Sequence, residues 1–290
     1  MVHYRSSRTT RACRSIGLRL DSADPSRHLG AAKAIATKKS IVVCGYPKSG
    51  TTWLCRLVGE LLPCPLMGGW GFSSGSAIEG HGRVSDFECY TSHHTLASLA
   101  SGKIGDYFKL VYIVRDPRDV AISAAHHFRV NILPIRGSNR LVAAVNSRVS
   151  RAVPYFVKRR RLIEAILYGD PSLSLWLATS WRDHYLQFRQ SNVLILKYED
   201  LLDDPMTKCV ELLSYLDIRR SDGSIAEAIS EQSFEKKKAL FKARGPTAEY
   251  EFLRRGGTGY WRDELSSKHK KLFVDELREE LVALSYAIDL

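Results

Sequence analysis

The chain has 290 residues, enough for one large domain or two small ones, and 44% of them are hydrophobic, which is ample for a core. Its 43 lysines and arginines outnumber 31 acidic residues, and the formal charge of +12 favours anionic partners. No window approaches the ~18 consecutive apolar residues of a membrane span, and the aromatic residues are not interleaved with basic ones as a nucleic-acid stacking platform requires.

Residues 1–40 look like a basic extension outside the folded domain. Before the first acid, Asp21, they contain serines, threonines and five arginines but no apolar run typical of a secretory signal. We expect a disordered tail, with an organelle transit peptide as the alternative. The six cysteines show no C-x-x-C pair and no metal-ligand spacing, and Cys44 and Cys55 are expected to be buried thiols. A reducing, cytoplasmic compartment is the simplest inference.

The first half of the remaining chain alternates strands and helices. The apolar run at 41–44 predicts a buried parallel strand, and 51–62 predicts a helix that ends before two prolines. The stretch 66–90 is rich in glycine and serine and is interpreted as loop. A second buried strand is predicted at 108–114, followed by a helix from Pro117 to about 128.

The second half repeats this order after a basic segment at 129–170, which we interpret as a variable insert. A helix at about 174–189, a strand at 193–197, and helices at about 204–216 and 266–287 follow. This order predicts one α/β domain at 41–290, with a central parallel β-sheet flanked by helices. In such sheets ligands bind outside the carboxyl ends of the strands.

The segment Gly45–Trp53, with the sequence G-Y-P-K-S-G-T-T-W, lies between the first strand and its helix. This strand-loop-helix resembles a P-loop, in which backbone N–H groups and the positive helix start bind an anion. The nucleotide-triphosphate P-loop has the pattern G-x-x-x-x-G-K-[ST]. Here Gly45 and Gly50 have that spacing, but Thr51 stands at the lysine position and the lysine is Lys48, inside the loop.

The string from Pro47 to Trp53 resembles the P-K-S-G-T-T-W loop of the cytosolic-type sulfotransferases. This family transfers a sulfonate group from 3′-phosphoadenosine 5′-phosphosulfate (PAPS) and leaves the bisphosphate PAP. The resemblance implies that a small-molecule acceptor offers a hydroxyl or an amine. It also implies that Lys48 takes part in catalysis and that the donor contacts residues of the loop: Lys48, Ser49, Gly50, Thr51, Thr52 and Trp53.

No metal ion is expected at this site. A transferring sulfonate carries less charge than a phosphoryl group, and Lys48 can stabilise the charge that grows on the bridging oxygen. We find no acidic magnesium ligand after a strand. The nearest candidate, Asp116, is expected to pair with Arg115 and Arg118.

Two further motifs resemble the parts of the family that bind the donor's 3′-phosphate. Arg115 at a strand end and Ser123 eight residues later match one pair, and an arginine fork suits a phosphate well. Near the C-terminus the loop R-R-G-G-T-G-Y-W-R at 254–262 matches the other, with Arg254, Arg255 and Gly256 in the binding positions. Two positions depart from the family pattern: its lysine is Arg255 here, which keeps the charge, and its usual aspartate is Tyr260, which changes the local packing.

The resemblance also implies where the adenine binds and which residue is the base. Trp53 and Phe234 match the aromatic pair that encloses the adenine, and Tyr198 matches a tyrosine beside it; a role in the core is the alternative for each. Histidine suits a base near neutral pH. The family histidine lies 22 residues before the strand-end arginine, which gives His93, with adjacent His94 as the alternative.

Other functions are kept as alternatives. A P-loop ATP-dependent small-molecule kinase would need magnesium, which the displaced lysine and the missing acidic ligand argue against. A nucleic-acid-binding protein would show steep salt dependence. A family member that binds the donor but lacks a working base also stays open, because the lysine and proline usually near the histidine are absent. Acceptor identity and oligomeric state stay open, a homodimer included.

Overall fold

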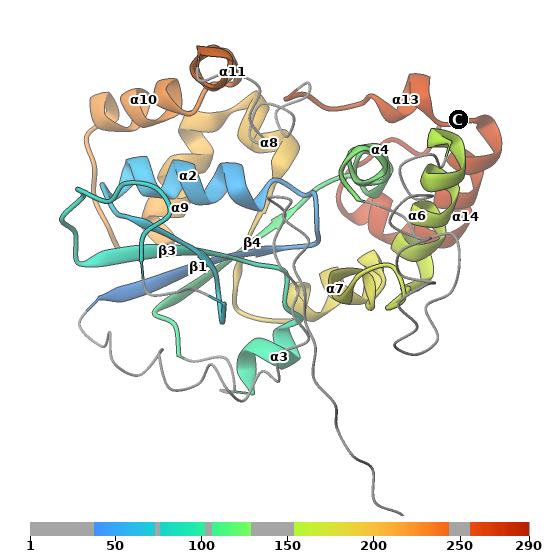
Figure 1. The fold of residues 1–290 in the computed structure, drawn as a ribbon, viewed down its shortest axis with the longest axis horizontal. Helices are drawn as coiled ribbons and strands as arrows, with labels where there is room; N and C mark the ends of the chain where they lie inside the picture. Colours follow the sequence, from blue (N-terminus) through green and yellow to red (C-terminus); the bar gives the residue numbers. More distant parts are fainter. Residues whose placement is uncertain (1–37, 73–75, 102–105, 129–153, 244–255, 290) are drawn as a thin grey trace, which may run out of the picture.

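The computed structural model describes residues 38–72, 76–101, 106–128, 154–243 and 256–289, with the exception of the Phe241 side chain. Within these ranges a sheet of five parallel strands crosses the molecule (Figure 1) in the order β2-β3-β1-β4-β5. The strands are β1 (Lys39–Gly45), β2 (Leu66–Gly69), β3 (Phe87–Ser92), β4 (Lys109–Val114) and β5 (Leu194–Lys197). The predicted α/β fold with a central parallel sheet is therefore confirmed.

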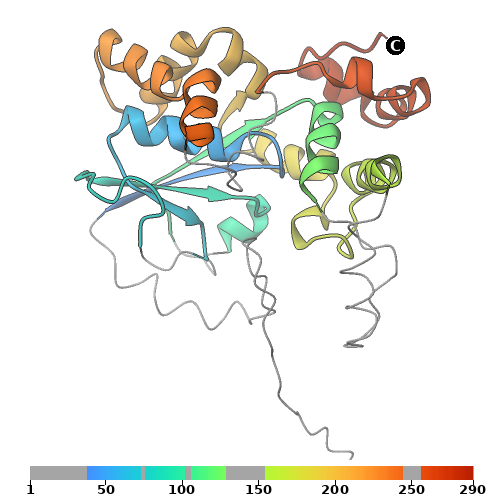
Figure 2. The ribbon, with the colours of Figure 1, turned by 45° about the horizontal axis from the view of Figure 1, so that its top comes forward.

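Helices cover both faces of the sheet, because the central strands are buried on both sides. In β1, Ile41 and Val43 face one hydrophobic core, and Val42 and Cys44 face the other. The helices of the first face, on the upper side in Figure 2, are α2 (Thr51–Leu61), α8 (Tyr198–Asp203), α9 (Pro205–Tyr215), α10 (Asp222–Glu231) and α11 (Phe234–Ala243).

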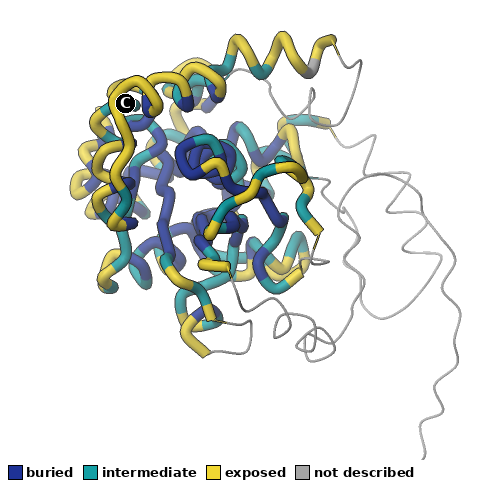
Figure 3. Tube along the Cα trace, turned by 90° about the vertical axis from the view of Figure 1, so that its left-hand side faces the viewer, coloured by how far each residue is buried: buried dark blue, intermediate teal, exposed yellow. Residues whose placement is uncertain are grey.

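The second core packs against a different set of helices. They are α3 (Leu96–Ala100), α4 (Pro117–His127), α6 (Tyr155–Tyr168), η2 (Leu175–Leu177), α7 (Trp181–Arg189), α13 (Trp261–Glu264) and α14 (Ser267–Ala283). In Figure 3 the strands and inner helix faces are buried, while α11 is exposed along most of its length. Among the helices of the described ranges, none combines the length and the apolar character needed to cross a bilayer.

The interpretation of 66–90 as loop was wrong, because this stretch contains strand β2 and the first four residues of β3. The sequence of β3, F-E-C-Y-T-S, does not look like a buried strand, because the charged residue Glu88 interrupts its apolar residues. In the structure Glu88 is nevertheless buried. The Glu88 carboxylate accepts hydrogen bonds from the hydroxyls of Ser40 and Tyr90, at 2.9 and 2.7 Å. A partner from β1 thus makes an acidic residue compatible with the inside of the sheet.

Two helices are shorter than predicted. The predicted helix at 174–189 is a short 3₁₀ turn, η2, and then α7, which begins after Ser180; the Ser180 hydroxyl accepts the N–H of Asp183. The last helix ends at Ala283 instead of 287, and Ser285 has a positive φ of 56°.

Of the basic segment 129–170, residues 129–153 lie outside the described ranges. The remainder forms α6, whose Leu162, Ile163 and Ile166 are buried in the core.

Candidate functional site

The sheet register brings four chain segments together at the carboxyl ends of the strands. Cys44 of β1 pairs with Ser92 of β3, and Gly45 pairs with Ile113 of β4. Val114 in turn pairs with Lys197 of β5. The residues that come next in the chain after β1, β3, β4 and β5 therefore lie side by side. The chain also crosses from one side of β1 to the other between β3 and β4, and such a reversal in strand order creates a crevice at the strand ends.

The loop after β1 is shaped to surround an anion. Lys48 and Gly50 both have left-handed backbones, with φ of 73° and 101°, and Gly50 directly precedes α2. A Cβ atom on Gly50 would lie 2.6 Å from the Tyr198 ring, so only glycine fits. Burial, and then the charge of Arg115, lower the pKa of Lys48 to about 7. A bound anion would raise this pKa again, because an opposite charge favours the protonated ammonium group.

Arg115 connects three of the converging segments. Its Nη2 donates to the Gly257 carbonyl at 2.9 Å, and its Nη1 donates to the Lys48 carbonyl at 3.4 Å. Its guanidinium also lies 4.3 Å from the centroid of the Tyr198 ring. The residue is buried and comes directly after β4, so its charge is held between the loop after β1 and the 256–261 turn.

Several buried polar atoms at this site have no hydrogen-bond partner among the described residues. They include the hydroxyl oxygens of Tyr46 and Ser49, the Nε2 of His94 and the Nε of Arg115. Buried polar atoms are seldom left unpaired, so each calls for a ligand or an ordered water. A hydroxyl donor and a guanidinium beside a lysine fit the negatively charged oxygens of a phosphate or a sulfate group. This arrangement fits the nucleotide that the sequence implies.

The predicted aromatic residues lie together beside these loops. The Trp53 indole donates to the Gln232 carbonyl at 3.1 Å and packs edge-on against Tyr198, with centroids 5.4 Å apart. Phe234 begins α11 and contacts Gly256, where a Cβ atom would lie 2.1 Å from the ring. Trp53 and Phe234 are half-buried, which leaves aromatic surface at the site.

His93 follows β3 and has a defined tautomer. Its Nδ1 lies 2.7 Å from the Gly45 carbonyl, and a carbonyl only accepts, so Nδ1 carries the proton and Nε2 carries the lone pair. Burial lowers the pKa of His93 to about 4, partly offset by this hydrogen bond, and the charges of Lys48 and His94 lower it further. At neutral pH His93 is therefore an uncharged imidazole whose Nε2 can accept a proton.

Two side chains that the sequence analysis did not single out surround this histidine. His184 of α7 is buried; its Nε2 donates to the His93 carbonyl at 3.2 Å and its Nδ1 accepts from the Tyr112 hydroxyl at 3.0 Å. Trp176 of η2 lies edge-on to His93 and His94, at centroid distances of 5.8 and 4.9 Å. Neither belongs to a motif, and their long sequence separation from His93 hides the contact.

Of the remaining predicted residues, Thr51 and Thr52 form the start of α2. Ser123 is half-buried in α4, and lies four residues after Asp119 and so on the same helix side. Arg254 and Arg255 lie outside the described residues. Asp116 pairs with Arg118 at 2.7 Å, and Arg115 donates elsewhere.

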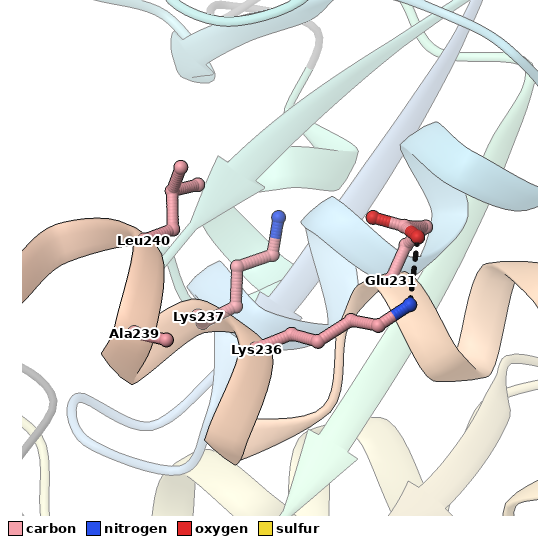
Figure 4. Close-up of a pocket in the computed structure, with 5 residues that line it drawn as sticks. All are labelled: Glu231, Lys236, Lys237, Ala239 and Leu240. Atoms are coloured by element: carbon pink, nitrogen blue, oxygen red, sulfur yellow. Dashed lines mark hydrogen bonds and ion pairs between the residues drawn. The ribbon is translucent and has the colours of Figure 1, made fainter. Parts of the chain in front are cut away.

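A separate hollow lies between α10 and α11 (Figure 4). It has a volume of about 400 Å³ and is lined by residues of both helices, among them Lys237 and Leu240. Lys236 at its edge pairs with Glu231 at 2.9 Å. The residues that line it include none of those predicted for the site, so we place the candidate site at the strand ends.

Comparisons with known proteins match the chain to one family and one fold. The model of the sulfotransferase domain family matches residues 70–285. A 3-beta-hydroxysteroid sulfotransferase of Cavia porcellus is 24% identical over 87% of this chain and 86% of its own length. An amine sulfotransferase of Oryctolagus cuniculus is 24% identical over 82% of this chain and 81% of its own length. The solved structure of mouse sulfotransferase SULT7A1 complexed with PAP has a TM-score of 0.59 at 22% identity, and the match covers 89% of this chain and 91% of that one.

Proposed function

Since the chain belongs to the sulfotransferase domain family, we propose that it transfers a sulfonate group from PAPS to a hydroxyl or an amine of a small-molecule acceptor. It is an enzyme of the PAPS-dependent sulfotransferase type, and the kinase alternative is not favoured. The observation that carries the residue-level proposal is the position of Arg115, which donates hydrogen bonds to the loop after β1 and to the 256–261 turn at once.

The loop after β1 binds the 5′ end of the donor in this proposal. Ser49, Thr51 and Thr52 offer hydroxyl groups, and Gly50, Thr51 and Thr52 offer backbone N–H groups, at the start of α2, where the helix dipole favours an anion. The unpartnered hydroxyl of Ser49 would gain an acceptor there. Lys48 supplies the positive charge. It stabilises the oxygen that becomes negative when the sulfur–oxygen bond to the 5′-phosphate breaks.

The other end of the nucleotide is assigned to Arg115 and Ser123 for the 3′-phosphate, with Arg254, Arg255 and Gly256 completing the set by resemblance to the family. We propose that Trp53 and Phe234 enclose the adenine and that Tyr198 lies beside it. The unpartnered Nε of Arg115 supports the first assignment, because a phosphate oxygen is the acceptor that a guanidinium fork prefers. We propose that lysine and arginine charges suffice and that no metal ion takes part.

His93 is the proposed general base. Its Nε2 accepts the proton of the acceptor's O–H or N–H as that oxygen or nitrogen bonds to sulfur, and the donor leaves as PAP. The Gly45 carbonyl stabilises the imidazolium that forms, since Nδ1–H already donates to it at 2.7 Å. Adjacent His94 makes no contact of this kind with Gly45 among the described residues, and it stacks on Phe72 instead, with centroids 5.7 Å apart. We therefore favour His93 over His94.

The acceptor is proposed to bind beside Phe72, His94 and Trp176, on the His93 side of the strand ends. These rings contact one another edge-on or stacked, and Phe72 is 52% exposed. An aromatic wall of this kind favours an acceptor with an apolar body and one reactive polar group. We also propose that the enzyme acts in the cytoplasm and has no nucleic-acid partner.

Thermal-shift measurements test the proposal. The full-length protein is heated with PAP, with ATP plus magnesium, and with duplex DNA, each over a range of concentrations. A ligand that binds only the folded state raises the melting temperature as its concentration increases. We expect stabilisation by micromolar PAP and little by the other two ligands. Stabilisation by ATP plus magnesium without stabilisation by PAP would contradict the proposal.

A further inference from the structure

Asp119, in the first turn of α4, holds the 256–261 turn through two backbone contacts. Its side-chain Oδ2 accepts the N–H of Gly259 at 2.6 Å, and its Oδ1 accepts the N–H of Trp261 at 3.1 Å. The residue is only 2% exposed. Both oxygens of a buried carboxylate are thus used on one turn, from a position some 140 residues earlier in the chain.

The turn depends on such contacts from outside. Trp261 is the first residue of the short helix α13, so its N–H has no acceptor within that helix. Gly259 has φ of 79°, and its carbonyl accepts the N–H of Arg262. The Trp261 ring is also fixed from α4, because the guanidinium of Arg118 lies 3.6 Å from its centroid.

The same turn reaches the nucleotide site two residues before the Asp119 contact. The Gly257 carbonyl accepts the Nη2 of Arg115 at 2.9 Å, and Gly256 packs on the Phe234 ring. Arg115 directly precedes Asp116, the N-cap of α4, and Asp119 follows four residues later in the first turn, so one short segment supplies both the cation and the anion that contact the turn. A shift of the turn would therefore move an acceptor of Arg115 as well as the wall beside Phe234.

Burial of an uncompensated carboxylate is costly. Desolvation raises the pKa of Asp119 above its ordinary value; the charge of Arg115 and the N–H groups of Gly259 and Trp261 reduce this shift, and the charge of Asp116 adds to it. The contacts that hold the turn therefore favour the ionised carboxylate. Replacement by asparagine keeps the size but presents an NH₂ group to one of the two N–H donors.

We propose that Asp119 is a positioning residue whose carboxylate holds the 256–261 turn in the geometry that binds the donor's 3′-phosphate. This inference rests on the proposed function and adds a residue that does not itself touch the nucleotide. The turn contacts Arg115, which is assigned to the 3′-phosphate, through the Gly257 carbonyl at 2.9 Å, and it is linked to the loop after β1 only through the 3.4 Å contact of Arg115 with the Lys48 carbonyl among the described residues. Binding of the 3′-phosphate should therefore depend on Asp119 more strongly than binding of the 5′ end does.

Isothermal titration calorimetry on the full-length protein tests this with two probes. PAP carries both phosphates, and adenosine 5′-monophosphate lacks the 3′-phosphate. In Asp119→Asn we expect the Kd for PAP to rise about tenfold or more, as loss of a charge-assisted hydrogen bond implies. The Kd for adenosine 5′-monophosphate should rise clearly less than that for PAP, because this nucleotide has no 3′-phosphate and is affected only through the packing of Gly256 on the Phe234 ring. Glu280→Gln is the control, because it also removes a buried carboxylate, but one that lies on α14 and pairs with Arg182 at 3.1 Å. This variant should bind both nucleotides as the wild type does.

The outcomes are separable. An unchanged PAP affinity in Asp119→Asn, or an equal loss for both nucleotides, would overturn the inference. A wild-type protein that binds the two probes equally would instead overturn the proposed function, and the inference with it. Should Asp119→Asn fail to fold, hydrogen exchange on the wild type gives a second readout: PAP should protect the Gly259 and Trp261 amides more than adenosine 5′-monophosphate does, and equal protection would overturn the inference.

Discussion

Replacement of Lys48 by methionine removes an ammonium group whose pKa burial and Arg115 lower to about 7. At that value the group is about half protonated at pH 7 and about one tenth protonated at pH 8. A phosphate bound at the loop would return the pKa toward its ordinary range, because an opposite charge favours the protonated form. PAP binding should therefore be accompanied by uptake of about 0.5 proton at pH 7 and about 0.9 proton at pH 8 by Lys48 alone.

The assay is calorimetry of PAP binding in two buffers of different ionisation enthalpy at each pH, which yields the number of protons exchanged. The ligand's own phosphates and the site histidines also titrate, so the quantity of interest is the difference between wild type and Lys48→Met. Methionine keeps the length and apolar character of the lysine stem. If both proteins exchange the same number of protons at both pH values, Lys48 does not face the bound phosphate and the reasoning fails.

Three further changes test other parts of the site. Gly256→Ala places a Cβ atom 2.1 Å from the Phe234 ring at a φ of 64°, and should weaken PAP binding about tenfold. Gly223→Ala is the control, since Gly223 has open space around it; equal PAP affinities of the two variants in calorimetry would contradict the packing. His93→Ala should keep PAP affinity but lower turnover about a hundredfold or more, and near-normal turnover would move the base elsewhere. His184→Phe removes the donor to the His93 carbonyl and should lower kcat severalfold with unchanged PAP affinity; a weakened affinity and a normal kcat would refute a role through His93.

Much of the fold could be predicted because its signals are local. The apolar runs around Val42 and Val111 are buried on both faces of the sheet, and such strands read as continuous hydrophobic segments. The boundaries of α2 and α4 follow from glycine and proline at their starts. Strand β3 was missed because Glu88 is tolerated only through hydrogen bonds from Ser40 and Tyr90.

The chemistry of the proposed donor-binding loop could be predicted from the sequence, because the lysine, hydroxyls and glycines that suit a phosphate are contiguous between Gly45 and Trp53 and keep that chemistry wherever the loop lies. Which residues contact this loop from distant parts of the chain could not be predicted, because those contacts depend on how the strands pair. The register of the parallel strands brings His93 to the Gly45 carbonyl and Arg115 to Tyr198. The proposed role of Asp119 could not be predicted for the same reason. Its sequence position shows only an aspartate near a helix start, and the fold brings the N–H groups of Gly259 and Trp261 to its carboxylate.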